Sequence, residues 1–543
     1  MLALVLFMVT GCDDKEEPSG IAADDSGAEV DDIASVDTDT VTAPDDTDAP
    51  TGGDGTDTQP DTDSAGVDVN DCVDDRSSDC SVSLDDAHLT ILGDLRDQFL
   101  GFSAHGVGDV DGDGLDDLMI GAHWDYSVAN LGGAAYLVSG AVASSLEGTV
   151  TAEIASIKLI GDHYEGYAGT EVVRAGDLNG DGLDDLLISA IGNEPVEGRA
   201  YLVWGDPSLS GERLLSDADV TLYGEHPDDF ASYSMSSGDV DGDGVPDLMI
   251  GAFGADVVED DEGLTYLLRS SDGLELSGDV ALADAGLIFV GEGTRHRAGR
   301  DVSYAGDVDG DGLDDLLIGA LDYDGVDEPD DEVGAAYLIL GASVWLQSGL
   351  VNLAAADRRW VGLRRDAQAG HTVVGAGDVN GDGLDDMLVA APGGYLHTAR
   401  DGEAYLILGE TGMMLAGPRS LTEAYATFVS SDHESIGGNM DAAGDVDGDG
   451  LADFLLGPIG SEEVSATLIY GAGIASLAGV NYADNSGFRF ESITGSQTYS
   501  ARPFGAGDVD GDGLDDLVFG DFEQDAPGGN EEGAAYLFFA AGL

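Results

Sequence analysis

Basic residues are scarce in this sequence: 19 Lys and Arg stand against 109 Asp and Glu among 543 residues, for a formal net charge of -90. Nucleic-acid phosphates and anionic lipid headgroups both need a basic protein surface, so neither is expected to bind this chain by charge. The excess of carboxylates opposes a compact state unless cations neutralise part of it. Whether the carboxylates are scattered or arranged therefore decides between a salt-adapted surface and metal sites.

Long apolar runs and catalytic motifs are also lacking. No apolar stretch is long enough to span a bilayer. Neither His-Glu-x-x-His nor Gly-x-Ser-x-Gly occurs, and the 9 His are dispersed without metal-ligand spacing. Aromatic residues make up only 7% of the chain, whereas Gly is abundant at 82 residues, which indicates many tight turns. These features favour a turn-rich binding or structural protein over an enzyme.

The 3 cysteines all lie near the N-terminus. Cys12 ends the run Val9-Thr10-Gly11-Cys12, after the apolar stretch 2–8, and this resembles the lipobox of bacterial lipoproteins. The resemblance implies that residues 1–11 are a signal peptide and that Cys12 is lipidated, although no Lys or Arg precedes the apolar stretch. The protein is then exported and held at the bacterial cell envelope or surface only through a lipid anchor. Cys72 and Cys80 predict a disulfide in an exported protein, with a zinc pair as the weaker alternative.

Residues 12–84 form a compositionally distinct segment. Asp, Thr, Ser, Gly and Pro dominate it, with no period and almost no aromatic residues. Such a segment cannot bury enough apolar surface to offset the entropy of ordering it. We therefore expect a disordered acidic linker or stalk, extended by its own charge.

From about residue 85 the residue pattern changes to short β-rich runs, and one nine-residue acidic string recurs seven times. The copies, called the acidic loops below, start at Asp109, Asp177, Asp239, Asp307, Asp378, Asp445 and Asp508. Each period of about 60–70 residues contains four strand-like runs, such as Ala134 to Val138 after the first string. This pattern predicts an all-β, seven-bladed β-propeller with four-stranded blades over residues 85–543.

The two ends of the repeat region predict how the ring closes. A fourth-strand run, His88 to Ile91, precedes the first acidic loop, and the chain stops after the third run of the last unit. The N-terminal strand is thus expected to complete the last blade. A solenoid would not need this offset and would need terminal caps instead.

Each acidic loop reads Asp-x-Asp/Asn-Gly-Asp-Gly-x-x-Asp. Oxygen-bearing side chains at positions 1, 3, 5 and 9, a backbone carbonyl at position 7 and a Gly for the sharp turn are what a loop around a hard cation requires. Calcium is favoured over magnesium, which prefers fewer protein ligands and tighter geometry. Position 8 is Pro246 or Ala452 in two copies, so it is not a required ligand. About seven calcium ions are predicted.

The predicted ligands follow unit by unit. They are Asp109, Asp111, Asp113, Leu115 and Asp117; Asp177, Asn179, Asp181, Leu183 and Asp185; Asp239, Asp241, Asp243, Val245 and Asp247; Asp307, Asp309, Asp311, Leu313 and Asp315; Asp378, Asn380, Asp382, Leu384 and Asp386; Asp445, Asp447, Asp449, Leu451 and Asp453; and Asp508, Asp510, Asp512, Leu514 and Asp516.

The loops differ from EF-hands, which need a Glu at position 12 and flanking helices. Position 12 is apolar here, as in Ile120, and the flanks are strand-like. Together with degenerate elements such as Leu100-Gly101 and Gly121-Ala122, the loops resemble the FG-GAP repeat of integrin α-subunit propellers and their bacterial relatives. Integrins carry fewer calcium loops than blades, whereas every unit here has one. This departure suggests structural calcium throughout.

Strand order divides the connections between two faces. The acidic loops join strands 1 and 2 and share a face with the 3–4 connections, which we call the acidic-loop face. The 2–3 and 4–1 connections form the opposite face, where integrin-like propellers bind partners. These connections differ between units and carry aromatic and basic residues. Examples are Trp124, Tyr164, Tyr499 and Arg502.

A candidate ligand patch lies in or beside the 4–1 connections that enter the fourth and fifth units. It consists of Arg295, Arg297, Arg300, Arg364 and Arg365. A protein or an acidic glycan can dock on such a patch. Alternatively, these arginines pair with nearby acidic residues such as Asp322 and Asp324.

The sequence thus predicts a cell-surface calcium-binding propeller that acts as a binding or adhesion module and is not an enzyme. One alternative is an extracellular polysaccharide lyase or hydrolase, for which His296 between Arg295 and Arg297 is the best candidate site. The other alternative is a purely structural surface protein.

Overall fold

The computed structural model describes residues 81–192, 197–258, 260–273, 276–325, 332–393, 402–411, 418–430, 435–459, 464–483, 486–491, 502–524 and 532–543. The predicted signal peptide, the lipidation site Cys12, the pair Cys72 and Cys80 and the acidic segment up to residue 80 lie outside the described residues.

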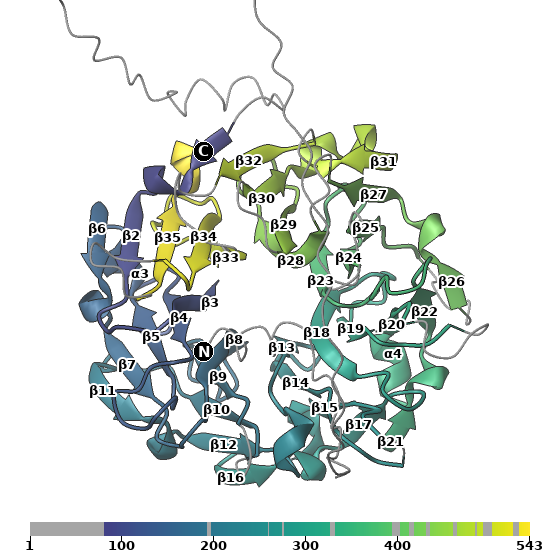
Figure 1. Ribbon diagram of the computed structural model, residues 1–543, viewed down its shortest axis with the longest axis horizontal. Coiled ribbons are helices and arrows are strands. Elements are labelled where there is room, and N and C mark those ends of the chain that lie inside the picture. The colour runs from purple at the N-terminus through teal and green to yellow at the C-terminus, as the bar shows by residue number, and fades with distance from the viewer. Residues whose placement is uncertain are drawn as a thin grey trace, which may run out of the picture. The chain divides into compact units, whose positions relative to one another are not determined.

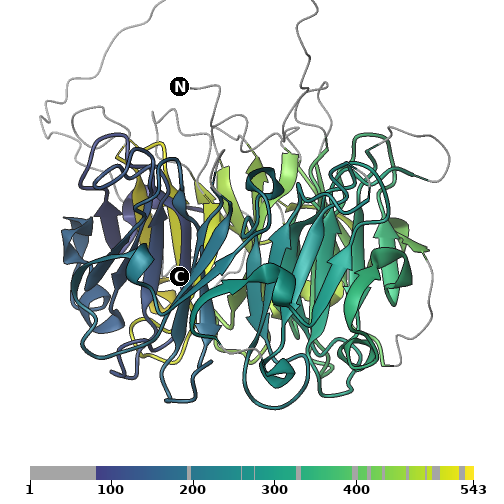
Figure 2. The same ribbon diagram turned by 90° about the horizontal axis from the view of Figure 1, so that it is seen from below.

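The repeat region folds into seven β-sheets arranged as the blades of a propeller, as predicted (Figure 1). Each acidic loop joins the first and second strands of its blade. The second strands are buried along their whole length, as in β4 (Leu118–Ala122) and β19 (Asp315–Ala320). Such strands are continuous apolar runs because neighbouring blades cover both of their faces. Figure 2 shows the strands running between the two faces of the propeller.

The blades, each ordered from the innermost strand to the outermost, have the following bounds. Blade 1 is β3 (Leu100–Gly106), β4, β5 (Ala134–Val138), β7 (Ile157–Ile160) and β11 (Gly211–Leu214). Blade 2 is β8 (Ala168–Gly176), β9 (Asp185–Ala190), β10 (Arg199–Val203), β12 (Val220–Tyr223) and β16 (Gly278–Ala281). Blade 3 is β13 (Met235–Gly238), β14 (Asp247–Ala252), β15 (Leu264–Leu268), β17 (Leu287–Val290) and β21 (Gly349–Asn352). Blade 4 is β18 (Ala298–Gly306), β19, β20 (Ala335–Ile339), β22 (Arg358–Val361) and β26 (Pro418–Ser420).

The remaining three blades follow the same order. Blade 5 is β23 (Val373–Gly377), β24 (Asp386–Ala391), β25 (Glu403–Ile407), β27 (Ala426–Val429) and β31 (Gly479–Tyr482). Blade 6 is β28 (Ser435–Gly444), β29 (Asp453–Ile459), β30 (Val464–Ile469), β32 (Phe488–Glu491) and β1 (Ser81–Ser83). Blade 7 is β33 (Arg502–Gly507), β34 (Asp516–Asp521), β35 (Ala534–Phe538), β2 (Leu89–Leu92) and β6 (Gly148–Thr151).

The strand count is the first correction to the sequence analysis, because every sheet has five strands where four were predicted. The fifth strand is donated by the 3–4 connection of the following unit and pairs in parallel with the fourth strand, as β6 does with β2. These donated strands are largely solvent-exposed. Each occupies the backbone hydrogen-bonding groups at the outer edge of a blade, which an exposed fourth strand would leave unpaired.

Ring closure agrees with the prediction. β2 pairs antiparallel with β35, with Leu89 opposite Leu537 and Leu92 opposite Ala534, and Figure 1 shows these two strands side by side. β1, which precedes β2 in the chain, pairs in parallel with β32 of blade 6. This strand extends the propeller by residues 81–84 beyond the predicted boundary at 85, and Leu84 is buried.

Glycines set the spacing between neighbouring blades. A Cβ on Gly121 in blade 1 would lie 2.1 Å from the carbonyl oxygen of Gly169 in blade 2. Gly319 and Gly370 in blades 4 and 5 make the same contact at 2.0 Å. The degenerate Gly elements of the repeat therefore meet across the blade interface, where no side chain fits.

The helices of the described residues are short and most lie in the 3–4 connections, although one 3₁₀ turn (Pro227–Asp229) lies in the 4–1 connection between β12 and β13. They are α3 (Gly140–Ala143), α4 (Gly341–Val344) and a set of single 3₁₀ turns. Within the described part of the chain, none of these helices has the length and apolar character needed to cross a membrane.

Candidate cation loops and the opposite face

The acidic loops hold their carboxylates in place through hydrogen bonds from their own backbone. In the first loop, the Asp109 carboxylate accepts N–H bonds from Gly112 at 2.7 Å and from Gly114 at 3.0 Å. Asp111 accepts from the backbone of Asp113 at 3.1 Å. Gly114 has a φ of +88°, a left-handed conformation that explains why position 6 is always Gly. The carboxylates are thereby turned toward the centre of the loop.

The Asp at position 9 joins its loop to the body of the blade. Asp117 is fully buried and accepts N–H bonds from Val110 at 3.0 Å and from Gly140 at 2.9 Å. All seven loops repeat this pair of bonds, and the seven acceptors are Asp117, Asp185, Asp247, Asp315, Asp386, Asp453 and Asp516. Position 9 is therefore structural as well as a possible ligand.

Burial raises the pKa of each position-9 carboxyl, and neighbouring loop carboxylates raise it further. The pKa of Asp117 is raised to about 7, with burial as the main cause and the charge of Asp111 contributing. The pKa of Asp516 is raised to about 8, where Asp510 plays the same part. In Asp185 and Asp386 the pKa is raised only to about 6. These loops therefore concentrate negative charge that the protein alone does not neutralise.

The arrangement fits a cation. Carboxylate oxygens from Asp109, Asp111 and Asp117 lie within 4.8 Å of one another, and so do those from Asp239, Asp241 and Asp247. The Oδ2 atom of Asp241 is buried without a hydrogen-bond partner. A buried carboxylate oxygen without a donor is costly unless a positive charge meets it. The predicted contribution of the position-7 carbonyls stays a prediction.

Position 8 has a role that the sequence analysis missed. The carboxylate of Asp184 accepts an N–H bond from Asp109 of the preceding blade at 3.1 Å, and the backbone of Asp184 donates to the Asp109 carbonyl at 3.1 Å. Five blade interfaces carry this side-chain link, formed by Asp116, Asp184, Asp314, Asp385 and Asp515. Position 8 is thus a contact between adjacent loops, and only a comparison across blades could have identified it.

Two loops have less negative charge than the other five. Their position 3 is Asn179 or Asn380, and the following blades have Pro246 and Ala452 at position 8. These two loops therefore lack one carboxylate of their own and also the carboxylate from the neighbouring blade. Their position-9 residues are the two with the smallest rise in pKa, to about 6.

On the opposite face, three of the five predicted arginines lie beside carboxylates. Arg297 pairs with Asp322 at 2.9 Å, and Arg364 pairs with Glu403 at 3.1 Å. Arg365 lies 3.6 Å from Asp366. The alternative reading, pairing with nearby acids, thus describes these three arginines well.

Arg295 and Arg300 differ from those three. Arg295 is exposed and holds a left-handed backbone, φ 61°. Arg300 lies in the innermost strand β18 with its guanidinium 4.1 Å from the ring centre of Tyr233. The five predicted arginines therefore differ in their surroundings, since three lie beside carboxylates and Arg300 stacks on a ring.

The candidate lyase residue His296 packs against Tyr323, with ring centres 4.8 Å apart. Burial lowers the pKa of His296, and its Nδ1 atom is buried without a hydrogen-bond partner. The flanking Arg297 is already paired with Asp322. The described contacts bring no substrate-facing acid–base pair to His296.

In the sequence analysis, Arg502 was named only as one residue of the variable connections, but in the structure it belongs to an innermost strand and stacks on an aromatic ring. It is the first residue of β33, an innermost strand, and its guanidinium lies 4.2 Å from the ring centre of Phe102. Phe102, whose carbonyl oxygen also accepts a hydrogen bond from Arg502, lies 400 positions earlier in the chain. Only the closed ring brings them together.

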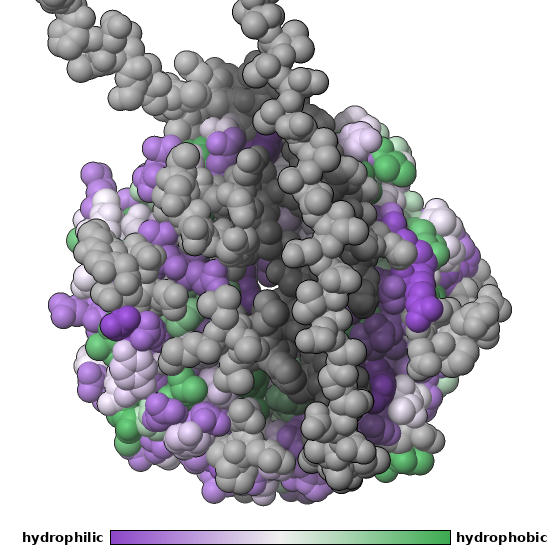
Figure 3. Space-filling model, in the orientation of Figure 1, coloured by the Kyte–Doolittle hydropathy of each residue, from purple (hydrophilic) through white to green (hydrophobic). Residues whose placement is uncertain are grey.

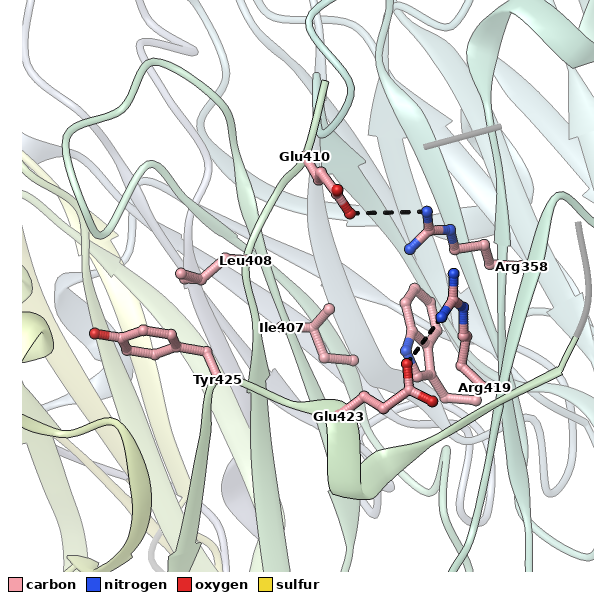
Figure 4. A pocket seen from close by; sticks show the side chains of 8 residues that line it. Arg358, Ile407, Leu408, Glu410, Arg419, Glu423 and Tyr425 are labelled. Atoms are coloured by element: carbon pink, nitrogen blue, oxygen red, sulfur yellow. Dashed lines mark hydrogen bonds and ion pairs between the residues drawn. The ribbon is translucent and has the colours of Figure 1, made fainter. Parts of the chain in front are cut away.

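A pocket of about 260 Å³ lies between blades 4 and 5, lined by residues of β22, β25 and β26 (Figure 4). Arg358 faces Glu410 across 3.9 Å, and Arg419 pairs with Glu423 at 2.9 Å. Because both arginines of this pocket already have carboxylate partners, the pocket offers no evident anion site.

The surface in view in Figure 3 is mostly hydrophilic where it is drawn in colour, with apolar residues scattered among polar ones. Individual exposed apolar residues of the opposite face include Tyr126, Tyr164 and Val258. Isolated apolar residues of this kind are normal on a soluble surface.

In the comparison with known proteins, two stretches of the chain match a known repeat family. The FG-GAP repeat model matches residues 231–268 and 370–407. Integrin alpha pat-2 of Caenorhabditis elegans is 27% identical over 260 residues, covering 45% of this chain and 19% of the relative. Integrin alpha-PS2 of Drosophila melanogaster is 34% identical over 179 residues, covering 31% and 12%.

A third relative is Integrin alpha-5 of Xenopus laevis, 31% identical over 170 residues, covering 30% of this chain and 16% of the relative. The chain thus spans less than a fifth of the length of these three relatives.

Proposed function

Because the chain carries FG-GAP repeats on a seven-bladed propeller similar to the N-terminal propellers of integrin α-subunits, we propose that it is a calcium-dependent binding or adhesion module. Its ligand, a protein or an acidic glycan, binds on the opposite face. The observation that carries this proposal is the contrast between the faces. All seven acidic loops keep the same bonds to their blades, whereas the 2–3 and 4–1 connections differ from unit to unit.

Calcium is assigned to all seven acidic loops. The side chains at positions 1, 3, 5 and 9 hold each ion, with the position-7 carbonyl as a further ligand. The ion supplies positive charge that offsets the repulsion among the loop carboxylates. The chain's own bonds, from position 9 to its blade and from position 8 to the next loop, connect each site to the fold.

The protein is assigned to the outside of the cell, anchored at the bacterial envelope through lipid on Cys12. Integrin relatives support a surface role, and the N-terminal run supports the anchor. Mass spectrometry of the mature N-terminus tests it. The expected species begins at a lipidated Cys12, and an intact Met1 on membrane-fractionated protein contradicts the anchor.

The binding role is tested with glycan and protein arrays. The full chain, carrying Cys12→Ser for solubility, is applied with calcium and with a chelator. Binding is expected only with calcium. Turnover of an acidic polysaccharide would favour the lyase alternative, and the absence of both binding and turnover would favour a structural protein.

A further inference from the structure

The pocket between blades 4 and 5 lies against the acidic loops, apart from the connections of the opposite face. Glu410, one of its lining residues, donates its backbone N–H to the carbonyl of Val308 at 2.9 Å. The N–H of Gly409 is donated to the Asp386 carboxylate at 2.8 Å. Val308 belongs to the acidic loop of blade 4, and Asp386 is position 9 of the loop of blade 5. Two acidic loops therefore hold this side of the pocket in place.

Arg358, on the other side of the pocket, interrupts an apolar row that the other six blades keep. In every blade, the first residue of the fourth strand stands opposite a Leu of the third strand, as Arg358 does opposite Leu338. The other blades have buried apolar residues at this position, namely Leu89, Ile157, Val220, Leu287, Ala426 and Phe488. The side chain of Arg358 is only 8% exposed. A buried charge is costly, and such departures from the folding pattern are expected at functional sites.

Charged groups of both signs line the pocket in equal number, although the chain carries a net charge of -90. Arg358 lies 3.9 Å from Glu410, and Arg419 lies 2.9 Å from Glu423. Pairing of β26 with β22 places Arg419 opposite Trp360. An anion that enters has to displace a glutamate, and a cation has to displace an arginine. An uncharged ligand with its own donors and acceptors can join both pairs.

The rest of the lining is apolar or aromatic. Trp360, Ile407, Leu408 and Tyr425 supply it, and in Figure 4 Leu408 and Tyr425 lie across the pocket from the two arginines. The hydroxyl of Tyr425 donates to the carbonyl of Ile474 at 3.3 Å, which holds the ring in place. The volume of about 260 Å³ is a little below the roughly 300–1,000 Å³ of pockets for drug-sized ligands. It therefore suits one small ring rather than a chain segment.

We propose that this pocket binds one uncharged sugar ring of a glycan. Each ring hydroxyl both donates and accepts hydrogen bonds, whereas arginine only donates and ionised glutamate only accepts. Neighbouring Arg and Glu side chains thus match neighbouring hydroxyls, and the C–H faces of the ring match Leu408 and Tyr425. A wholly apolar ligand would desolvate the charged groups without giving them new partners. This site is separate from the one proposed on the opposite face and takes a different ligand.

The test uses the full chain with Cys12→Ser in calcium and an array of uncharged oligosaccharides as the probe. Calorimetric titration of the strongest binder then compares variants. Arg358→Leu installs the residue that blades 3 and 7 have in the row, and we expect it to weaken binding at least ten-fold. Its melting temperature should stay the same or rise, because an apolar residue replaces a buried charge. Arg419→Gln should also weaken binding at least ten-fold.

Arg213→Gln is the matched control. Arg213 occupies the corresponding place in β11, opposite Leu159, and pairs with Asp219 at 3.3 Å. We expect this variant to bind as the natural chain does. Unchanged calcium content shows that all three variants keep the propeller.

Each other outcome overturns a defined part of the proposal. Oligosaccharides that bind Arg358→Leu as tightly as the natural chain overturn the pocket as their site. Binding of uronate oligosaccharides or acidic peptides alone, lost in Arg358→Leu, overturns the uncharged ligand. If the folded, calcium-loaded chain binds no uncharged oligosaccharide, the proposal fails altogether. The ligand of the opposite face is tested separately, by the arrays described above, and none of these results decides it.

Discussion

The two faces of this propeller are built from connections of the same seven blades, yet they differ in how strictly they repeat. On the acidic-loop face, every loop binds its blade through the same two backbone bonds to position 9. On the opposite face, the 2–3 connections range from the short link between Ile459 and Val464 to the long one between Ala320 and Ala335. The acidic loops therefore repeat strictly from blade to blade, whereas the 2–3 connections vary in length.

The two faces also differ in how their carboxylates are grouped. Each acidic loop groups its carboxylates with one another and holds one of them buried with a raised pKa, as at Asp315 and Asp516, whereas on the opposite face Asp322 pairs with Arg297. In the proposed function, calcium offsets the negative charge of the loops, whereas the pair of Arg297 and Asp322 needs no added cation. The comparison predicts that conditions affecting cations act on one face and leave the other largely unchanged.

Removal of calcium is expected to have the largest effect. A ligand that binds only the folded state stabilises it by roughly 2.7 kcal/mol per site at a hundred times its dissociation constant. With seven sites, a chelator should lower the melting temperature by about 10 °C or more. Thermal melts with chelator, with calcium restored and with magnesium in its place check this. Equal melting temperatures in all three would remove the contrast between the faces.

Loss of one buried loop carboxylate should lower the free energy of unfolding more than loss of one salt bridge on the opposite face. Asp117→Ala leaves the amides of Val110 and Gly140 without acceptors, and we expect a loss of roughly 3–5 kcal/mol. The matched change Arg364→Gln removes an ion pair with Glu403 and should cost under about 1 kcal/mol. Urea denaturation of both variants decides the point. Because the amide bonds do not need calcium, part of the Asp117 effect must persist in chelator.

The seven loops should separate into five tighter and two weaker calcium sites. The weaker pair are the loops with Asn179 and Asn380, which lack a carboxylate at position 3 and the Asp from the next blade. Ligand charge is a main determinant of calcium affinity. Calorimetric titration should resolve two classes, and Asn179→Asp should tighten one weak site by about ten-fold. Seven indistinguishable sites would contradict this assignment.

The smallest predicted effect concerns Asp441, which lies in the innermost strand β28 between the two faces. Burial raises its pKa to about 7, and it accepts a backbone bond from Gly505 at 3.0 Å. Because the folded-state pKa is raised, ionisation of Asp441 reduces stability as the pH rises through 7, and this cost is absent below the ordinary pKa of the group. Asp441→Asn cannot ionise and keeps one acceptor oxygen.

In saturating calcium, Asp441→Asn is expected to exceed the natural chain in free energy of unfolding by roughly 1–3 kcal/mol at pH 8.5 and to match it near pH 4. His105, 3.6 Å away, adds little above pH 5 because burial lowers its pKa to about 4. A difference that does not change with pH would show that Asp441 acts through packing alone.

The parts of this fold that the sequence predicted are those encoded within one repeat. The acidic loops, the four strands around each and the closing strand at Leu89 are local patterns that recur or match a missing partner. The fifth strands were not predicted because they are short and exposed, and they pair with the neighbouring blade. Gly148, for example, begins a strand that pairs with β2 of the preceding blade, which is distant in sequence.

The missed parts of the sites share the same cause. The link from Asp184 to Asp109 crosses a blade interface, so comparison of copies showed only that position 8 varies. Arg502 stacks on Phe102, 400 positions earlier in the chain, and only the closed ring brings these two residues together. Pairing of Arg297 with Asp322 was weighed as an alternative for the patch, but sequence spacing could not choose between the two readings.

Metal content tests the central claim, that the acidic-loop face is held by cations, most directly. The full chain with Cys12→Ser is equilibrated with millimolar calcium, and bound metal is measured by elemental mass spectrometry against protein concentration. The account predicts close to seven calcium ions per chain, with five retained when free calcium is lowered and the two Asn-containing loops empty first. Less than one calcium per chain, in a folded protein, would contradict it.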